Sequence, residues 1–339
     1  MIVYLKTNTS TTQIAEMQLH LKQAGFESYL VQQPNICMVP ALKDPSIIER
    51  FPFISGFKLI STAYQLSSNE YKNETLFEVN GVQVGSNFAN IIAGPCSVES
   101  EEQIFETAAF LHKNNIKFIR GGAYKPRTSP YSFRGLGKEG LKLLQEAAKQ
   151  YKLNVVTELM DLSLLDEVMA YSDVIQIGSR NMANFYMLSE LGKINKPILL
   201  KRGMQAKVNE WLLAADYIMS SGNEKIILCE RGIRSFDPMS RNVMDVAVIP
   251  LIQSLSHLPI IADPSHGTGD SKLVPIMAKA SMVAGANGLM IEIHPNPSEA
   301  LSDAKQALNF TDFETLLSDL EVLKPAIKKP IDASYSVFI

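Results

Sequence analysis

The sequence has little of what marks secreted, membrane or nucleic-acid-binding proteins. Its three cysteines, Cys37, Cys96 and Cys229, are too few and too scattered for a disulfide framework. It has no run of about 18 apolar residues, so we expect no membrane span. Lysine and arginine total 32 against 35 aspartate and glutamate residues, with no basic block, so we expect no nucleic-acid partner. The first ten residues do not resemble a secretory signal, and we therefore expect a cytoplasmic protein.

Residues 1–70 predict a small domain of their own. Apolar strand-like runs and helical patterns alternate along it in the order βαββαβ, at residues 1–6, 7–25, 26–32, 35–42, 45–55 and 56–64. This order is that of a ferredoxin-like or ACT-like domain. The polar stretch 65–74 that follows is predicted to be a linker. Asn80-Gly81, between alternating apolar residues, then predicts a β-hairpin.

From residue 90 onward, short apolar runs alternate with longer segments of helical periodicity. Eight such runs are present: NIIAGPC, IKFIRGG, LNVVTE, DVIQIG, PILLKR, KIILCERG, PIIADPSH and GLMIEIH. Apolar strands joined by helical crossovers indicate a parallel sheet covered by helices. An open doubly wound sheet is the alternative, but the count of eight and the lack of a GxGxxG motif favour a closed barrel. We therefore predict an α/β protein with a (β/α)8 TIM barrel in residues 71–339, preceded by the hairpin and a ferredoxin-like domain.

Charged residues follow the predicted strands, at the end where TIM barrels hold their active sites. The cations among them are Arg120, Lys125, Arg127, Arg180, Lys201 and Arg231. The guanidinium fork of arginine suits phosphates and carboxylates, because it binds two oxygens at once. A single such residue is typical of a surface salt bridge. The whole set at one rim indicates a substrate that carries several negative charges.

A second group of rim residues has the chemistry of metal ligands: Cys96, His266, Glu292 and Asp303. Thiolate, imidazole and carboxylate together suit a borderline divalent metal. The residues are far apart in the sequence, so no spacing motif proves the site. Closure of the barrel would make the first, seventh and eighth strands neighbours. Taken alone, Cys96 is typical of a core cysteine, and His266 of a structural or proton-carrying histidine.

Several of these stretches together resemble the signature blocks of one enzyme family. IIAGPCSVES, IRGGAYKPRTSPYSFRGLG, IQIGSRN, LLKRGM, LCERGIR, DPSHGTG, IEIHPNP and ALSDAKQAL are similar to blocks of the 3-deoxy-D-arabino-heptulosonate 7-phosphate (DAHP) synthases. The similarity runs from about Ile91 to Asp312 and is greatest to the short microbial form. That form shares a superfamily with 3-deoxy-octulosonate 8-phosphate synthase. The N-terminal domain resembles the regulatory extension of some members.

The resemblance implies a role for each rim residue. A divalent manganese, iron, cobalt or zinc ion would be held by Cys96, His266, Glu292 and Asp303. Phosphoenolpyruvate would be bound by Arg120, Lys125, Arg180, Lys201 and Arg231, and the aldose phosphate by Arg127 and Thr128. Lys125, Glu158 and His266 would be the catalytic residues. Two departures from the family pattern are Arg134, where glutamine is common, and Ala304, where glycine is common.

The implied reaction condenses phosphoenolpyruvate with erythrose 4-phosphate, the entry step of aromatic amino acid biosynthesis. The resemblance also implies an aromatic amino acid effector and a homo-oligomer, either a dimer or a tetramer. The nearest alternative is an octulosonate synthase using arabinose 5-phosphate, but that family usually has a KANRS-like stretch where this chain has KPRTS at 125–129. Two further alternatives are a Schiff-base aldolase with Lys201 as nucleophile and an inactive sugar-phosphate sensor.

Overall fold

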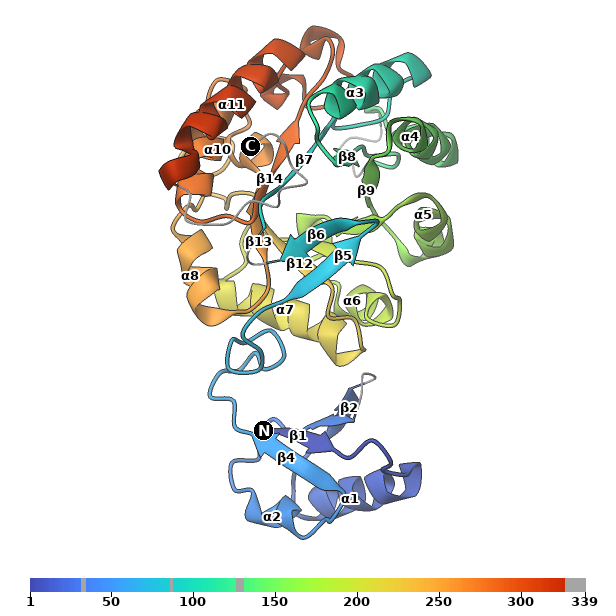
Figure 1. Ribbon diagram of the computed structural model, residues 1–339, viewed down its shortest axis with the longest axis vertical. Coiled ribbons are helices and arrows are strands. Elements are labelled where there is room, and N and C mark those ends of the chain that lie inside the picture. The colour runs from blue at the N-terminus through green and yellow to red at the C-terminus, as the bar shows by residue number, and fades with distance from the viewer. Residues whose placement is uncertain (32–34, 86–87, 126–130, 327–339) are drawn as a thin grey trace.

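The larger region of the molecule is a closed barrel of parallel strands surrounded by helices (Figure 1). The computed structural model describes residues 1–31, 35–85, 88–125 and 131–326, so the predicted ligands Arg127 and Thr128 lie outside the described residues. The strands are β7 (Asn90–Gly94), β8 (Phe118–Arg120), β9 (Asn154–Glu158), β10 (Val174–Ile177), β11 (Ile198–Lys201), β12 (Ile226–Glu230), β13 (Ile260–Ala262) and β14 (Gly288–Glu292). They pair in chain order, and β14 pairs with β7 to close the barrel. All eight predicted strands and the predicted barrel are confirmed.

Helices cover the outside of the barrel and are fixed by local sequence signals. They are α3 (Glu101–Lys113), α4 (Lys138–Tyr151), α5 (Leu165–Tyr171), α6 (Phe185–Leu191), α7 (Val208–Ser220), α8 (Val248–Leu255), α10 (Val274–Val283) and α11 (Phe310–Leu323). Ser100 caps α3 by accepting a hydrogen bond from the Gln103 N–H at 3.1 Å. Trp211 of α7 is fully buried, and its indole N–H donates to the Leu200 carbonyl at 3.2 Å. Packing of apolar helix faces on the strands thus encloses the barrel.

Side chains inside the barrel form a core separate from the layer between strands and helices. The interior core consists of one or two residues from each strand: Ile92, Phe118, Val156, Val174, Leu199, Ile227, Cys229, Ile261 and Met290. Val79, Val82 and Val84 join it from β5 (Leu76–Val79) and β6 (Val82–Gly85). The hairpin turn has positive φ at Asn80 (45°) and Gly81 (86°), as the Asn-Gly pair predicts. The predicted hairpin is present and fills the amino-terminal end of the barrel.

The N-terminal region is a four-stranded antiparallel sheet with two helices. Its elements are β1 (Ile2–Leu5), α1 (Thr11–Gln23), β2 (Tyr29–Val31), β3 (Ile36–Met38), α2 (Ser46–Glu49) and β4 (Ile54–Lys58). The sheet order β2-β3-β1-β4, with antiparallel neighbours, is the ferredoxin-like arrangement. The second helix is shorter than the predicted range 45–55, and the last strand begins and ends earlier than the predicted range 56–64. The helix is one turn long because Pro52 disfavours helical backbone at Phe51, and Ile54 already pairs with Leu5 of β1.

The segment that follows, residues 65–75, is anchored to the barrel, although its polarity predicted a free linker; we call it the strap. The half-buried Asp216 carboxylate of α7 accepts hydrogen bonds from the backbone N–H groups of Gln65 and Ser67 at 2.5 and 2.7 Å. The ring of His257 lies between the Thr75 hydroxyl (2.5 Å) and the Leu66 carbonyl (2.7 Å). The polar residues of the strap therefore bind barrel groups as well as solvent. Among the described residues, no helix has the length and apolar character needed to cross a bilayer.

Candidate active site

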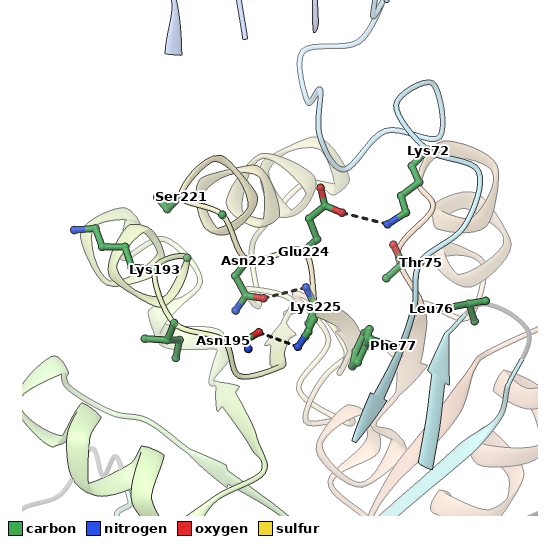
Figure 2. A pocket seen from close by; sticks show the side chains of 13 residues that line it. Lys72, Thr75, Leu76, Phe77, Lys193, Asn195, Ser221, Asn223, Glu224 and Lys225 are labelled. Carbon is green, nitrogen blue, oxygen red and sulfur yellow. Dashed lines mark hydrogen bonds and ion pairs between the residues drawn. The ribbon is translucent and has the colours of Figure 1, made fainter. Parts of the chain in front are cut away.

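Cavities lie at both ends of the barrel, and they differ in chemistry. One, of about 330 Å³, lies at the amino-terminal end between the β5–β6 hairpin and the ends of α6 and α7 (Figure 2). Its charged side chains already have partners: Lys72 pairs with Glu224 at 3.2 Å, and the Lys225 ammonium donates to the Asn195 side-chain oxygen at 2.8 Å. None of the described candidate residues lines it. The candidate catalytic residues therefore lie at the other end of the barrel, where the strands have their carboxyl ends.

The second cavity, of about 270 Å³, opens at the carboxyl ends of the strands. It is lined by eight of the residues predicted from the sequence: Arg120, Lys125, Glu158, Arg180, Lys201, Arg231, His266 and Asp303. Side chains along a strand alternate in direction, so a rim residue two positions after an interior one also points inward. Phe118 is followed in this way by Arg120, and Leu199 by Lys201. The same step from other interior residues gives Glu158, Arg231, Asp263 and Glu292.

Rim residues with the opposite alternation face the helices. Arg202 donates to the carboxylates of Glu230 at 3.0 Å and Asp245 at 2.9 Å, and none of the three lines the cavity. The alternation thus separates the two neighbouring cations, Lys201 inside the cavity and Arg202 outside it. It explains why only part of the charge at the strand ends belongs to the site.

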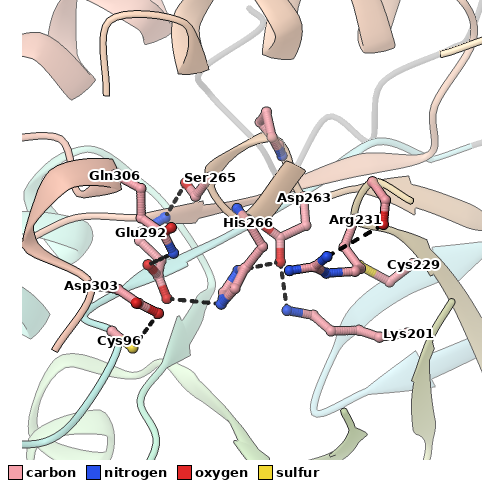
Figure 3. A network of polar contacts seen from close by, with 12 residues as sticks. Cys96, Lys201, Cys229, Arg231, Asp263, Ser265, His266, Glu292, Asp303 and Gln306 are labelled. Carbon is pink, nitrogen blue, oxygen red and sulfur yellow. Dashed lines mark hydrogen bonds and ion pairs between the residues drawn. The ribbon is translucent and has the colours of Figure 1, made fainter. Parts of the chain in front are cut away.

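Three of the four predicted metal ligands come together in a buried cluster (Figure 3). Ligand atoms of Cys96, Glu292 and Asp303 lie within 4.8 Å of one another. Pairing of β14 with β7 sets Glu292 opposite Gly94, which brings Cys96 to the same place. The fourth residue, His266, has its Nε2 atom 3.4 Å from Glu292 Oε1. Barrel closure therefore assembles residues that are far apart in the sequence.

The ionisation of this cluster is set by burial and by its neighbours. Burial and the Glu292 carboxylate raise the pKa of the Cys96 thiol to about 11. Burial would also raise the pKa of Glu292, but the charges of His266 and Arg120 lower it to about 2. The Arg120 guanidinium donates to Glu292 Oε1 at 2.6 Å. A thiol, an imidazole and two carboxylates form a donor set that fits a borderline divalent metal, and such an ion would favour the thiolate.

Asp263 connects the metal cluster with the cationic half of the cavity. This fully buried carboxylate accepts a hydrogen bond from the Lys201 ammonium at 2.5 Å, and its Oδ2 lies 2.7 Å from His266 Nδ1. Burial would raise the pKa of Asp263, but His266 and Lys201 hold it well below its usual range. Because Asp263 contacts Nδ1 of His266, the other ring nitrogen, Nε2, faces Glu292. Sequence reasoning gave Asp263 no role, although its alternation from Ile261 points it inward.

The remaining predicted residues occupy different depths of the cavity. The Lys125 ammonium donates to the Cys96 carbonyl at 2.9 Å, next to the metal cluster. Glu158 accepts from the Gln176 side-chain amide at 3.3 Å, and any side chain at Gly178 would collide with it, because a Cβ there would lie 2.0 Å from Glu158 Oε1. Arg180 follows β10 in a short turn and is exposed.

Some cavity residues were missed by sequence reasoning. Arg234, Arg241 and Asn242 come from the long segment between β12 and α8, and Gln176, Ser179 and Met204 also line the cavity. The available signal was the length of that segment, because long loops at this face of a TIM barrel commonly carry function.

Known proteins match this chain over most of its length. The sequence matches the DAHP synthetase I family over residues 64–329. The phospho-2-dehydro-3-deoxyheptonate aldolase of Thermotoga maritima is 42% identical over 333 residues, which cover 96% of this chain and 98% of that protein. The 2-dehydro-3-deoxyphosphooctonate aldolase of Francisella tularensis subsp. holarctica is 32% identical over 70% of this chain and 92% of its own length.

Solved structures give the same result. The crystal structure of the Thermotoga maritima DAHP synthase aligns with a TM-score of 0.79 at 41% identity, covering 98% of this chain and 99% of that one. A truncated form of the Thermotoga maritima enzyme aligns with a TM-score of 0.74 at 45% identity, covering 79% of this chain and 99% of that one. The expected resemblance, fold and activity class are thereby confirmed, and the chain belongs to the DAHP synthetase I family.

Proposed function

We propose that this protein condenses phosphoenolpyruvate with erythrose 4-phosphate and water, giving DAHP and phosphate, and that it needs a divalent metal to do so. One observation carries the proposal: a single cavity of about 270 Å³ is lined both by a set of cations and by His266 and Asp303 of the metal cluster. An anionic substrate and the group that the metal would activate would therefore meet there. The chain is 42% identical to the heptonate enzyme over 96% of its length, but 32% identical to the octonate enzyme over 70% of its length. This difference favours erythrose 4-phosphate over arabinose 5-phosphate.

The metal would be held by Cys96, His266, Glu292 and Asp303, and when bound it would supply a Lewis acid for the aldehyde oxygen. Manganese, iron, cobalt and zinc all accept such ligands. Three free cysteines, one of them a proposed metal ligand, agree with a reducing cytoplasmic location.

Phosphoenolpyruvate would bind on the cationic side. We assign its phosphate and carboxylate to Arg120, Lys125, Arg180, Lys201 and Arg231. These cations are in place before the substrate arrives, so they stabilise its changing charge with little reorganisation. Arg127 and Thr128 are proposed to hold the aldose phosphate.

The remaining roles follow from position. The methylene carbon of phosphoenolpyruvate bonds to the aldehyde carbon, water adds at the neighbouring carbon, and phosphate leaves from that carbon. Lys125, beside Cys96, is placed to give a proton to the former aldehyde oxygen. Glu158 faces the cavity and is placed to take a proton from the attacking water. His266 acts through its contacts with Asp263 and Glu292.

The geometry argues against Lys201 as a Schiff-base nucleophile. Its nitrogen is buried and forms an ion pair with Asp263 at 2.5 Å, and an ammonium in such a pair has no lone pair for attack on a carbonyl. Its charge instead suits an anionic substrate group.

We further propose that residues 1–70 are a regulatory domain that binds an aromatic amino acid, and that the protein is a homo-oligomer. Two observations support the homo-oligomer. The described part of the N-terminal sheet has β2 and β4 as edge strands, and exposed Tyr29, Leu30 and Phe57 lie on them. Open edges of this kind tend to pair with another sheet.

Product analysis with both aldoses tests the proposal. Phosphoenolpyruvate and erythrose 4-phosphate should give the seven-carbon product, arabinose 5-phosphate should give little eight-carbon product, and a chelator should stop turnover. Equal or better use of arabinose 5-phosphate would identify the octulosonate activity. Borohydride-trapped adducts and full activity with chelator would identify a Schiff-base aldolase.

A further inference from the structure

A buried glutamine lies directly behind the metal cluster. Gln306, 1% exposed, belongs to a short turn (Ala304–Gln306) that follows Asp303. Its side-chain Nε2 donates to Glu292 Oε2 at 2.5 Å, as Figure 3 shows. Its Oε1 accepts a hydrogen bond from the Arg241 guanidinium. Gln306 therefore joins a proposed metal ligand to a residue of the β12–α8 segment.

The Arg241 side chain is 43% exposed, but its stem and its guanidinium both contact the protein. The backbones of Ile233 and Val243 exchange two hydrogen bonds of 2.9 Å, which close the base of its loop. The Asn242 side-chain amide donates to the His266 carbonyl at 3.0 Å. The stem of Arg241 passes over Gly269, where a Cβ would lie 2.7 Å from it. The last glycine of the DPSHGTG motif therefore leaves room for this arginine.

The chemistry of arginine fixes the orientation of the Gln306 amide. A guanidinium only donates hydrogen bonds, so the amide oxygen of Gln306 must face Arg241 and its NH₂ group must face Glu292. Gln306 then holds Glu292 Oε2, while Oε1 faces Arg120 and His266 Nε2.

Asp303 shows the same division of its oxygens. Its Oδ1 lies 3.6 Å from Arg241 Nη1, and its Oδ2 lies 3.4 Å from Cys96 Sγ. Its backbone is in the left-handed region, with φ at 53°, a conformation that few residues other than glycine adopt. Arg241 thus orients the Asp303 carboxylate, while the backbone of Asp303 keeps its left-handed conformation. In both carboxylates one oxygen is held from behind and the other faces the cluster.

We propose that Gln306 and Arg241 are positioning residues of the metal site, orienting Glu292 and Asp303 for the ion. The proposal rests on the proposed metal site. Partners that orient ligands commonly change metal affinity by about 10–100-fold when removed. Because Arg241 also lines the cavity, the same pair links the β12–α8 segment to the metal.

The test is titration of the metal-stripped, full-length protein with Co²⁺, followed by the thiolate-to-cobalt absorption that Cys96 would give. Gln306→Leu keeps the approximate size but loses both hydrogen bonds, so we expect about 10–100-fold weaker Co²⁺ binding and a changed absorption band. Lys305→Arg is the matched control: it lies in the same turn, its side chain is exposed, and the substitution keeps the charge. Its affinity and band should equal those of the unsubstituted protein.

Arg241→Met separates positioning from general electrostatics, and it decides the question if circular dichroism shows that Gln306→Leu does not fold. Loss of a cation beside acidic ligands would tighten Co²⁺ binding by electrostatics alone, whereas loss of positioning weakens it. Unchanged affinity and band in Gln306→Leu, or tighter binding in Arg241→Met, would overturn the proposal. If the unsubstituted protein does not bind Co²⁺, the metal site itself is wrong and this proposal falls with it.

Discussion

Arg180 lies exposed at the open side of the cavity, where an arriving anion would meet it. We expect Arg180→Lys to keep the charge but lose the bidentate hydrogen bonding to a phosphate or carboxylate. The loss should be about 2 kcal/mol, which corresponds to roughly 30-fold in KM for phosphoenolpyruvate. Steady-state kinetics with each substrate varied in turn measures this. A change confined to the KM for erythrose 4-phosphate would reverse the assignment.

At the scale of single residues, the sequence was informative where alternation along a strand could be followed. Arg120, Lys201 and Glu292 each follow an interior residue by two positions, so their direction was predictable. Gln306 and Arg241 were not predictable in this way, because 65 residues separate them and their contact depends on the path of two loops. Loop residues have no periodicity from which a direction could be inferred.

Asp216 of α7 is the main polar anchor of the strap. Removal of its carboxylate from water raises its pKa, and it accepts hydrogen bonds from three backbone N–H groups, those of Gln65, Leu66 and Ser67. Asp216→Asn would turn an NH₂ group toward these donors and leave some without a partner. We expect a loss of about 1–3 kcal/mol in the free energy of unfolding, measured by denaturant titration.

Asp319→Asn is the control for that measurement. Asp319 accepts a hydrogen bond from the Lys279 ammonium at 2.6 Å, and its side chain is 42% exposed. Exposed ion pairs contribute about 0–1 kcal/mol. Equal losses in the two variants would mean that the strap is not anchored through Asp216.

At the scale of elements, strands and the hairpin were predictable from regular patterns, whereas an irregular segment that packs on the barrel was not. The eight strands were identified because each is a β-branched run bounded by helices, and the hairpin because Asn-Gly favours its turn. The polar residues of the strap predict a linker. Their polarity instead serves contacts with Asp216 and His257, which lie about 150 or more residues away in the chain. A sequence pattern cannot distinguish a polar group bound by water from one bound by protein.

For the whole molecule, the proposed regulatory role of residues 1–70 can be tested by two truncations that differ only in the strap. A chain beginning at Tyr64 keeps the strap and the start of the family match, whereas one beginning at Glu74 loses most of it. We expect the longer form to be stable, active and insensitive to tyrosine or phenylalanine. The shorter form should unfold at a lower temperature, because it exposes Asp216 and its apolar surroundings.

Inhibition by an aromatic amino acid that survives equally in the longer form would show that the N-terminal domain is not the sensor. If neither amino acid affects the full-length chain, the feedback role fails for those effectors. A coupling of about 1–3 kcal/mol between the two sites would give a useful range of inhibition.

The central claim is that one rim of the barrel joins a cationic pocket to a metal held partly by a thiol. Its most direct test measures phosphate release from phosphoenolpyruvate by the metal-stripped protein, with erythrose 4-phosphate present, as Mn²⁺ is returned. We predict no release without metal, full release on its return, and no recovery in Cys96→Ala at Mn²⁺ concentrations that saturate the unsubstituted protein. Full activity of the metal-stripped protein, or of metal-stripped Cys96→Ala, would contradict the account.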